Sequence, residues 1–416
     1  MEFMKLRIAD LVPASYNPRK KLKPGDKEFE KIKNSIIEFG YVEPIIVNSD
    51  FTIIGGHQRA TVLQTLGNEE IDCIVIDIDK TREKALNIAL NKITGEWNKE
   101  LLADLIKDLQ SSDFNVEFTG FEPPEIDDLF TQVHNKDAKE DDFDLDAAIE
   151  EPSFVKPGDV WTLGRHRLMC GDSTKKDDVE ILMDGKQANL CVTDPPYNCD
   201  IEGGTGLKIM NDHMGNDDFY KFLLSAFQNI YNSLADGGAI YIFHSDAEKV
   251  NFFNATVSAG FHYSTTCIWV KNSLVIGRMD YQMRHEPIIY AFKDTAKHRW
   301  YSDRKQTSIW EFDRPTKSKL HPTMKSIELL AYPIRNSSQV NGIVVDLFGG
   351  SGSTLIACEQ MDRIAYLMEL DPKYASVIVK RYLESMEGKT DGIYVMRDGQ
   401  KLTLEEAMID EKEAQE

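Results

Sequence analysis

Apolar and polar positions follow short, alternating patterns over the first 110 residues. A helical period between Asp26 and Gly40 predicts a helix, because an aspartate favours a helix start and a glycine favours its end. Apolar runs predict strands at residues 44–47, 51–54 and 71–78. Further helices are predicted at 55–67 and over most of 81–110, with a break near Gly95. This order predicts a small α/β domain.

From residue 157 to about 397, short apolar runs alternate with helical patterns. The runs that predict strands are residues 188–193, 239–243, 265–270, 287–292, 342–347 and 365–370. Such alternation favours a Rossmann-like doubly wound α/β sheet, mostly parallel with an antiparallel strand, which binds ligands at the carboxyl ends of its strands. The predicted domains are residues 1–110, an appendage and acidic linker at 111–156, the doubly wound domain at 157–397 and a charged tail at 398–416.

The composition is that of a folded protein, with 42% hydrophobic and 28% charged residues. No apolar run reaches the ~20 residues that a bilayer requires, so we expect no membrane contact. The six cysteines are scattered without a C-x-x-C pair, which argues against a zinc ribbon and a disulfide scaffold. We therefore expect a cytoplasmic protein with reduced thiols.

The charge is unevenly spread along the chain. The net charge is −21, and residues 137–151 contain eight acids and one lysine. Residues 271–325 instead contain 12 Lys/Arg against 6 Asp/Glu. An acidic protein with one basic stretch is compatible with local contact to a nucleic-acid backbone, and a solvated charged face is the alternative.

A stiff acidic turn follows the apolar strand at 188–193. Its residues are Asp194-Pro195-Pro196-Tyr197. Each proline fixes φ and removes a backbone donor, so carbonyl oxygens and the Asp194 carboxylate can accept hydrogen bonds from an –NH2 group. Tyr197 can stack on the ring that carries this amine. The turn suits an exocyclic base amine rotated out of a duplex, although it could also be a structural corner ended by prolines.

A glycine-rich turn, Phe348-Gly349-Gly350-Ser351-Gly352, stands between a predicted strand and a predicted helix. Glycines let the backbone approach a ligand, and the helix start favours a carboxylate or phosphate. Glu369 ends the next strand, where an acid suits ribose hydroxyls. Dinucleotide binding is the alternative, but G-x-G-x-x-G is not met because its third position falls on Leu355.

These turns resemble motifs of one family. Residues 194–197 match the D-P-P-Y signature of amino-methyltransferases, and 348–352 match their F-x-G-x-G loop. The segments 321–325 (H-P-T-x-K), 171–173 and 269–271 also match. The D-P-P-Y turn precedes the glycine turn by 152 residues, counted from Asp194 to Asp346. This permuted order resembles the β group of DNA amino-methyltransferases, over roughly residues 157 to 397.

The resemblance implies S-adenosylmethionine as cofactor and direct in-line methyl transfer to a flipped base. Asp194, Pro195, Pro196 and Tyr197 would be catalytic. Gly350 and Gly352 would hold the methionine part of the cofactor, Asp346 its ammonium and Glu369 its ribose. Further candidates for cofactor contacts are Phe348, Ser353, Thr354, Asp371, Asp172, Ser173, Thr323 and Lys325, the last two also as residues of the base pocket.

The implied substrate is double-stranded DNA, as in restriction–modification systems. The family places target recognition between residues 272 and 320, where candidate DNA contacts are Arg278, Arg284, Arg299, Arg304 and Arg314. Asp194 as the first residue of its motif favours N6 of adenine, since serine is common in N4-cytosine enzymes. Carbon-5 methylation of cytosine is disfavoured because the chain has no Pro-Cys turn. A homodimer is compatible with the family.

The N-terminal part resembles the ParB-like domain, through Leu11-Val12-Pro13, Asn17-Pro18-Arg19 and Gly55-Gly56-His57-Gln58-Arg59. In chromosome-partitioning relatives the last turn helps to bind a nucleotide. Here His57 and Gln58 replace the usual acidic and basic pair, so a docking or DNA-orienting role competes with nucleotide binding.

Three other interpretations remain open from the sequence. A ParB-like DNA-binding regulator could carry a non-catalytic methyltransferase domain, or the substrate could be RNA or protein.

The histidines lack close ligand spacing, so we expect no metal.

Overall fold

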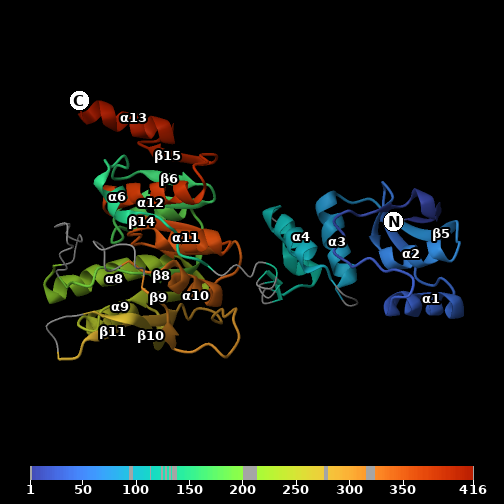
Figure 1. Cartoon of the computed structure of the whole chain (residues 1–416), viewed down its shortest axis with the longest axis horizontal. Coiled ribbons are helices and arrows are strands. Elements are labelled where there is room, and N and C mark those ends of the chain that lie inside the picture. Colours follow the sequence, from blue (N-terminus) through green and yellow to red (C-terminus); the bar gives the residue numbers. More distant parts are fainter. Residues whose placement is uncertain are drawn as a thin grey trace. The chain divides into compact units, whose positions relative to one another are not determined.

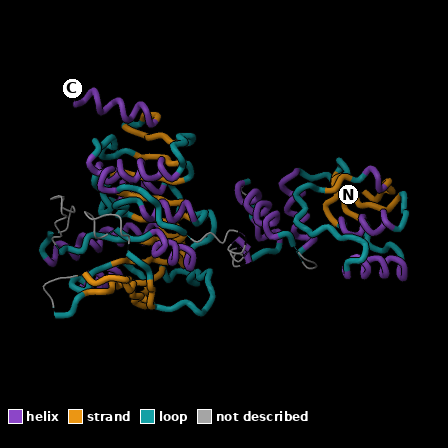
Figure 2. Tube along the Cα trace, viewed as in Figure 1, coloured by secondary structure: helices purple, strands orange, loops and turns teal. Residues whose placement is uncertain are grey.

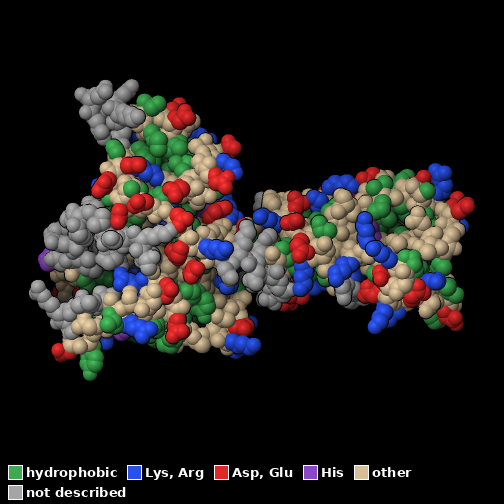
Figure 3. Space-filling view, viewed as in Figure 1, with side chains coloured by type: hydrophobic (Ala, Val, Ile, Leu, Met, Phe, Trp, Pro, Cys, Tyr) green, Lys and Arg blue, Asp and Glu red, His purple; other side chains and the backbone are tan. Residues whose placement is uncertain are grey.

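The computed structural model describes the chain except for residues 1, 93–96, 113, 123–124, 127–128, 131–132, 134–137, 200–212, 276–279, 315–323 and 416. It forms two compact units, residues 1–135 and 136–416, which are described separately (Figure 1). Within the described residues, no helix is long and apolar enough to cross a membrane. On the face seen in Figure 3, acidic and basic side chains are interspersed over each unit.

The first unit is built on a five-stranded sheet with the order β1-β5-β3-β4-β2. Its strands are β1 (Glu2–Arg7), β2 (Val12–Pro13), β3 (Ile45–Asn48), β4 (Thr52–Gly55) and β5 (Glu70–Ile76). The predicted strands at 44–47 and 51–54 are present as β3 and β4, which pair antiparallel. The helices are α1 (Lys27–Phe39), α2 (His57–Thr65), α3 (Lys80–Asn91) and α4 (Lys99–Ser111). The α/β expectation for this part is confirmed.

The second unit is built on an eleven-stranded sheet with the order β12-β10-β11-β9-β8-β13-β14-β7-β6-β15-β16. Its central strands β9, β8, β13, β14 and β7 are parallel, and the strands toward both edges include antiparallel pairs. The strand bounds are β6 (Val160–Leu163), β7 (His166–Cys170), β8 (Ala188–Thr193), β9 (Leu234–Phe243), β10 (His262–Val275), β11 (Met283–Phe292), β12 (Ile309–Glu311), β13 (Ile343–Asp346), β14 (Ile364–Glu369), β15 (Ile393–Arg397) and β16 (Gln400–Thr403). The predicted Rossmann-like doubly wound sheet is confirmed.

Helices cover both faces of this sheet, and each face has its own buried apolar cluster (Figures 1 and 2). One cluster includes α10 (Ile327–Ser337), α11 (Ser353–Gln360) and α12 (Pro372–Ser385). The other includes α7 (Lys176–Met183), α8 (Asn216–Ser233) and α9 (Lys249–Ser258). A sheet buried on both sides needs apolar residues at successive positions, which explains the continuous run in β8. The tail ends in α13 (Leu404–Gln415).

Part of the segment that the sequence predicts to be a linker is folded. Residues 145–150 form a short helix, α6 (Leu145–Glu150), whose cap Asp144 accepts a hydrogen bond from Ala147. Leu145 and Ile149 are buried against Val377 of α12. The stretch from Lys139 to Val155, called the connector below, therefore packs on the second unit despite its acidic composition.

Candidate active site

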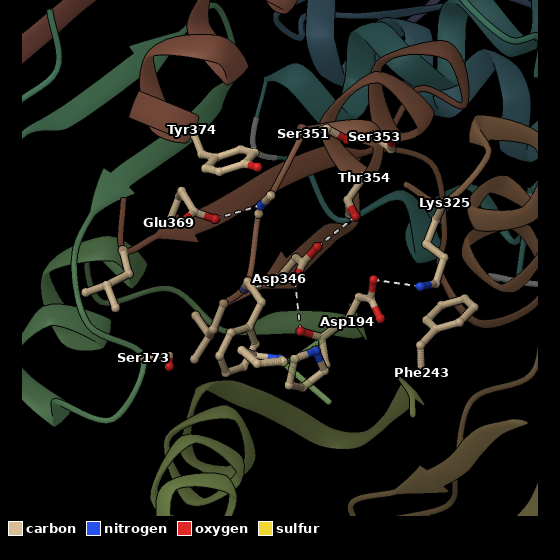
Figure 4. A pocket seen from close by; sticks show the side chains of 18 of the residues that line it. Ser173, Asp194, Phe243, Lys325, Asp346, Ser351, Ser353, Thr354, Glu369 and Tyr374 are labelled. Atoms are coloured by element: carbon tan, nitrogen blue, oxygen red, sulfur yellow. Dashed lines mark hydrogen bonds and ion pairs between the residues drawn. The ribbon is translucent and has the colours of Figure 1, made fainter. Parts of the chain in front are cut away.

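The acidic turn lies at the carboxyl end of β8, in the centre of the sheet. β8 pairs with β9 on one side and with β13 on the other. The glycine-rich turn follows β13, so parallel neighbours bring the two turns together although they are far apart in sequence. Both turns line one pocket (Figure 4). The structure therefore places Asp194 and the glycine turn in a common site.

Asp194 is held at both carboxylate oxygens. Lys325 Nζ donates to Asp194 Oδ2 at 2.7 Å, and the Tyr197 hydroxyl donates to Asp194 Oδ1 at 2.6 Å. Lys325 Nζ also lies 2.8 Å from Glu286 Oε1, and Lys271 Nζ donates to Glu286 Oε2 at 2.8 Å. Two carboxylates and two ammonium groups thus form a network whose formal charges cancel.

The charges of this network are set by burial and pairing. Burial raises the pKa of Asp194, and the nearby Lys325 ammonium opposes that rise. Burial acts to raise the pKa of Glu286, but Lys325 and Lys271 hold it below its usual range. Burial acts to lower the pKa of Lys325, but the two carboxylates raise it overall. Lys325 therefore stays an ammonium, and its charge favours the ionised form of both carboxylates.

The glycine turn is shaped by its contacts to β14 and α12. Gly350 and Gly352 have φ values of 51° and 80°, in the left-handed region that favours glycine. Gly352 is the N-cap of α11. A Cβ added at Gly352 would lie 3.2 Å from a side-chain carbon of Ile378. The turn thus combines an unusual backbone with close packing, and both requirements favour glycine.

Asp346, at the end of β13, connects the two turns. Its Oδ1 accepts a hydrogen bond from Thr193 at 2.8 Å, and its Oδ2 accepts one from Thr354 at 2.7 Å. Thr193 directly precedes Asp194, and Thr354 is in the first turn of α11 (Figure 4). Burial raises the pKa of Asp346 to about 7, against the hydrogen bonds from Thr354, Thr193 and the Phe348 amide.

Glu369 is the second buried carboxyl group of the pocket. Its side chain accepts hydrogen bonds from the amides of Gly350 at 2.7 Å and Asp371 at 2.9 Å. Burial raises the pKa of Glu369 to about 7. Among the described residues, neither Glu369 nor Asp346 forms an ion pair with a cationic side chain. The pocket therefore suits a ligand that brings positive charge, and S-adenosylmethionine carries a sulfonium and an ammonium.

Most predicted cofactor residues share this pocket. Its lining includes Asp172, Ser173, Lys325, Asp346, Phe348, Gly350, Ser353, Thr354, Glu369 and Asp371, together with the turn 194–197. Gly352 belongs to the same glycine turn. Thr323 and Arg278 lie outside the described residues. Arg284, Arg299 and Arg304 are exposed, and Arg314 is partly exposed. The assigned roles of these residues remain predictions.

Sequence reasoning missed several residues of the site. Glu286 begins the apolar run of β11, and an acid in that position was a usable signal. Glu286 does not line the pocket but contacts Tyr197 and Lys325, which do. The other missed residues, Tyr374, Phe243 and Leu145 of the connector, line the pocket themselves. Among the described residues, no group of three or more His, Cys, Asp or Glu could hold a metal ion.

A doubly wound sheet with an acidic D-P-P-Y turn beside a glycine turn is the arrangement of a methyltransferase that uses S-adenosylmethionine. Comparison with known proteins supports this class. The family model "DNA methylase" of the N6/N4 methyltransferases matches residues 188–380. The ParB N-terminal domain matches residues 1–92, and the ParB-methyltransferase HTH domain matches residues 100–157. The chain therefore carries an N6/N4-type DNA methyltransferase domain joined to a ParB-like domain.

Curated relatives match the two parts separately. Type II methyltransferase M.HpaI of Haemophilus parainfluenzae is 23% identical over 245 residues, which are 53% of this chain and 76% of the relative. A probable chromosome-partitioning protein ParB of Campylobacter jejuni is 34% identical over 108 residues, which are 25% of this chain. The match spans only 38% of the length of that ParB protein.

The similar solved structures have TM-scores below 0.5. The M1.HpyAVI–SAM complex is 21% identical with a TM-score of 0.42, and it covers 51% of this chain and 97% of its own. PvuII DNA methyltransferase, described as cytosine-N4-specific, is 16% identical with a TM-score of 0.42. The match covers 55% of this chain and 95% of that structure. A ParB of Caulobacter crescentus complexed with CTP-gamma-S is 19% identical with a TM-score of 0.21. The match covers 32% of this chain and 78% of that structure. Nucleotide binding by the turn 55–59 stays a prediction for this chain.

Proposed function

We propose that this DNA methyltransferase methylates the exocyclic N6 of adenine in double-stranded DNA. The observation that supports it is the Asp194 carboxyl group, which lines the pocket of the glycine turn at the end of β8 and is paired with Lys325. The family resemblance associates an aspartate at this position with adenine. The N4 amine of cytosine is the alternative substrate, since both amines can donate two hydrogen bonds.

The residues of the acidic turn would act directly on the amine. The bound cofactor supplies a methyl group on a positively charged sulfur. The Asp194 carboxylate and the Pro195 carbonyl accept the two amine hydrogens, which draws the nitrogen lone pair out of conjugation with the ring. As the nitrogen–methyl bond forms, the methyl–sulfur bond would break and leave the sulfur neutral. Positive charge develops on the nitrogen, and the Asp194 carboxylate stabilises that charge. One amine proton is then released to water.

Lys325 and Glu286 would position this carboxylate. Both Asp194 oxygens already accept a hydrogen bond, one from Lys325 and one from Tyr197. Each carboxylate oxygen has two lone pairs, so one acceptor position remains on each for the amine. The same contacts fix the carboxylate before the base arrives, and such preorganisation lowers the barrier of the chemical step.

The Tyr197 ring would form one side of the base pocket. Its hydroxyl is anchored by Asp194 and Glu286, and its ring packs edge-on against Phe252. A ring held in this way can stack on a flipped base, which contributes ~1–3 kcal/mol. That gain is comparable to the few kcal/mol that unstacking a base costs.

The experiment is methylation of unmethylated genomic DNA, followed by digestion to nucleosides and mass spectrometry. We expect N6-methyladenine, and N4-methylcytosine alone would contradict the choice of base. Asp194→Ala should lower turnover by about 10²–10³-fold, because one preorganised acceptor is lost. Asp177→Ala, an exposed aspartate of α7, is the matched control. Unchanged formation of methylated nucleosides by Asp194→Ala would contradict the catalytic assignment.

A further inference from the structure

The connector, residues 139–155, forms one wall of the cofactor pocket. Leu145 of α6 lines this pocket together with Met324 and Tyr374. Its side chain is buried in an apolar cluster that also contains Ala148, Ile149 and Val377. The pocket of the methyltransferase unit is therefore completed by a segment that precedes β6 in the chain.

An ion pair connects this segment to the glycine turn. Arg381 of α12 donates to Asp141 through Nε at 2.7 Å and through Nη2 at 2.9 Å. The Nη1 of the same guanidinium donates to the Ser351 carbonyl at 2.9 Å and to Ser353 Oγ at 3.0 Å. The Arg381 side chain is only 2% exposed. One rigid group thus holds the connector carboxylate on one side and the glycine turn on the other.

Further hydrogen bonds fix the connector along its length. The Lys139 amide donates to Gln360 Oε1 at 2.7 Å, and Gln360 Nε2 donates back to the Lys139 carbonyl at 3.0 Å. At the other end, Ser376 Oγ accepts from the amides of Phe154 and Val155, both at 3.1 Å. These contacts go to α11 and α12, the helices that follow the glycine turn and β14.

We propose that the connector is a working part of the cofactor site, and that Asp141 is a positioning residue for the glycine turn through Arg381. The ParB-methyltransferase HTH model matches residues 100–157 and so includes the connector. Any rearrangement of that segment which withdraws Asp141 or Leu145 alters cofactor affinity. By thermodynamic reciprocity, the cofactor holds the connector in place. The inference rests on cofactor binding and is independent of the base that is methylated.

Asp141→Asn in the full-length chain tests this proposal. It keeps the size of the side chain but removes the charge that pairs with Arg381. The guanidinium is then held less firmly on the side that faces the connector. We expect the Kd for S-adenosylmethionine, measured by calorimetry without DNA, to rise about tenfold. We also expect KM for the cofactor to rise while kcat stays within about twofold, because the acidic turn is untouched.

Two further variants separate positioning from a general effect. Asp177→Asn makes the same change at an exposed residue of α7, outside the connector, and should leave the Kd unchanged. Asp141→Glu keeps the carboxylate and should restore part of the affinity. The proposal is overturned if Asp141→Asn binds the cofactor like wild type, or if both substitutions at this position lower affinity equally with equal loss of melting temperature.

Limited proteolysis supplies a second readout. Glutamyl endopeptidase can cut the connector at Glu140, Glu150 or Glu151. S-adenosylmethionine should slow these cuts severalfold in wild type and less in Asp141→Asn. Equal cleavage with and without the cofactor in wild type, at concentrations well above Kd, would contradict the proposed coupling.

Discussion

Asp346 and Glu369 share an unusual property, because both are buried carboxyl groups with hydrogen bonds but without a cationic side chain in the described structure. Their neighbours are hydroxyls and amides, such as Thr193, Thr354 and the Gly350 amide. Neutral donors compensate only part of the cost of burying a charge. A cationic ligand supplies the rest, so the protonation of these two groups and the binding of the cofactor are linked.

The first prediction concerns pH. The pKa of Asp346 rises from 3.8 to about 7, so the folded ligand-free protein takes up a proton that the unfolded chain lacks between those values. Its stability should therefore fall as pH rises from about 4 to about 7. Cofactor affinity should change in the opposite direction and strengthen about tenfold from pH 6 to pH 8, as the carboxylate forms. Calorimetry over this range checks it.

Asp346→Asn provides the comparison for the pH series. The variant cannot ionise at this position, so its cofactor Kd should be weaker at pH 8 and depend less on pH than that of wild type. Titration of the cofactor itself contributes equally to both proteins. Identical pH profiles for the two proteins would contradict the link between Asp346 and the ligand.

The second prediction concerns Glu286. Glu286→Gln leaves Lys325 with Asp194 as its only carboxylate in the described network, so Asp194 is drawn more strongly to the ammonium and accepts an amine less well. Turnover should fall on the order of tenfold, equivalent to about 1.4 kcal/mol in the barrier, with little change in cofactor Kd. Glu311→Gln, on the exposed part of β12, is the control. An unchanged kcat would contradict a role of Glu286 in positioning Asp194.

At the scale of elements, the position of each turn depends on the strand before it and, for the glycine turn, also on the helix after it.

The third prediction compares two glycines in the left-handed region. Gly352→Ala introduces a Cβ 3.2 Å from Ile378, whereas Gly388→Ala meets nothing within 4 Å although its φ is 76°. Each pays a backbone cost of roughly 1–3 kcal/mol. Urea unfolding should show a larger loss for Gly352→Ala, and that variant should also bind the cofactor less tightly.

The sequence predicted the central elements because their signals are local. The runs in β8, β13 and β14 are continuously apolar, as buried parallel strands require. The strands β6, β7, β12, β15 and β16 were missed because each has five residues or fewer, and β7 and β16 begin with polar residues. Helix α6 was missed because the segment around it, residues 137–151, contains eight acids, although Leu145, Ala148 and Ile149 follow a helical period after the cap Asp144.

The site was predictable only in part for a similar reason. Asp194, Asp346 and Glu369 each end an apolar strand, so their positions at one edge of a parallel sheet follow from the pattern. The network around Asp194 does not, because its contacts join Asp194 to Lys325, 131 positions away, and Tyr197 to Glu286, 89 positions away, and they depend on the packing of β11. Likewise, no local signal pairs Asp141 with Arg381.

At the scale of the whole molecule, an acidic protein must bind a polyanion. The fourth prediction places this contact in residues 271–325, which carry 12 Lys/Arg against 6 Asp/Glu within a net charge of −21. Replacing Arg284 and Arg304 together by alanine should weaken DNA binding and lower the slope of log K against log salt by about 2, if each meets one phosphate.

Fluorescence anisotropy with a labelled duplex at several salt concentrations measures this slope. Lys389→Ala, combined with Lys176→Ala, removes the same charge from exposed positions elsewhere in the unit and is the matched control. Equal slopes for the two double variants would show that the net charge, and not the 271–325 stretch, determines the salt dependence.

The hydrogen bond from Thr193 to Asp346 has a kinetic consequence. It joins β13, which leads into the glycine turn, to β8, which leads into the acidic turn. Binding of the cofactor and binding of the base therefore affect each other. We expect cofactor bound at β13 to restrain the β8 turn further before any base is extruded. This favours an ordered mechanism in which the cofactor enters first and its demethylated product leaves last.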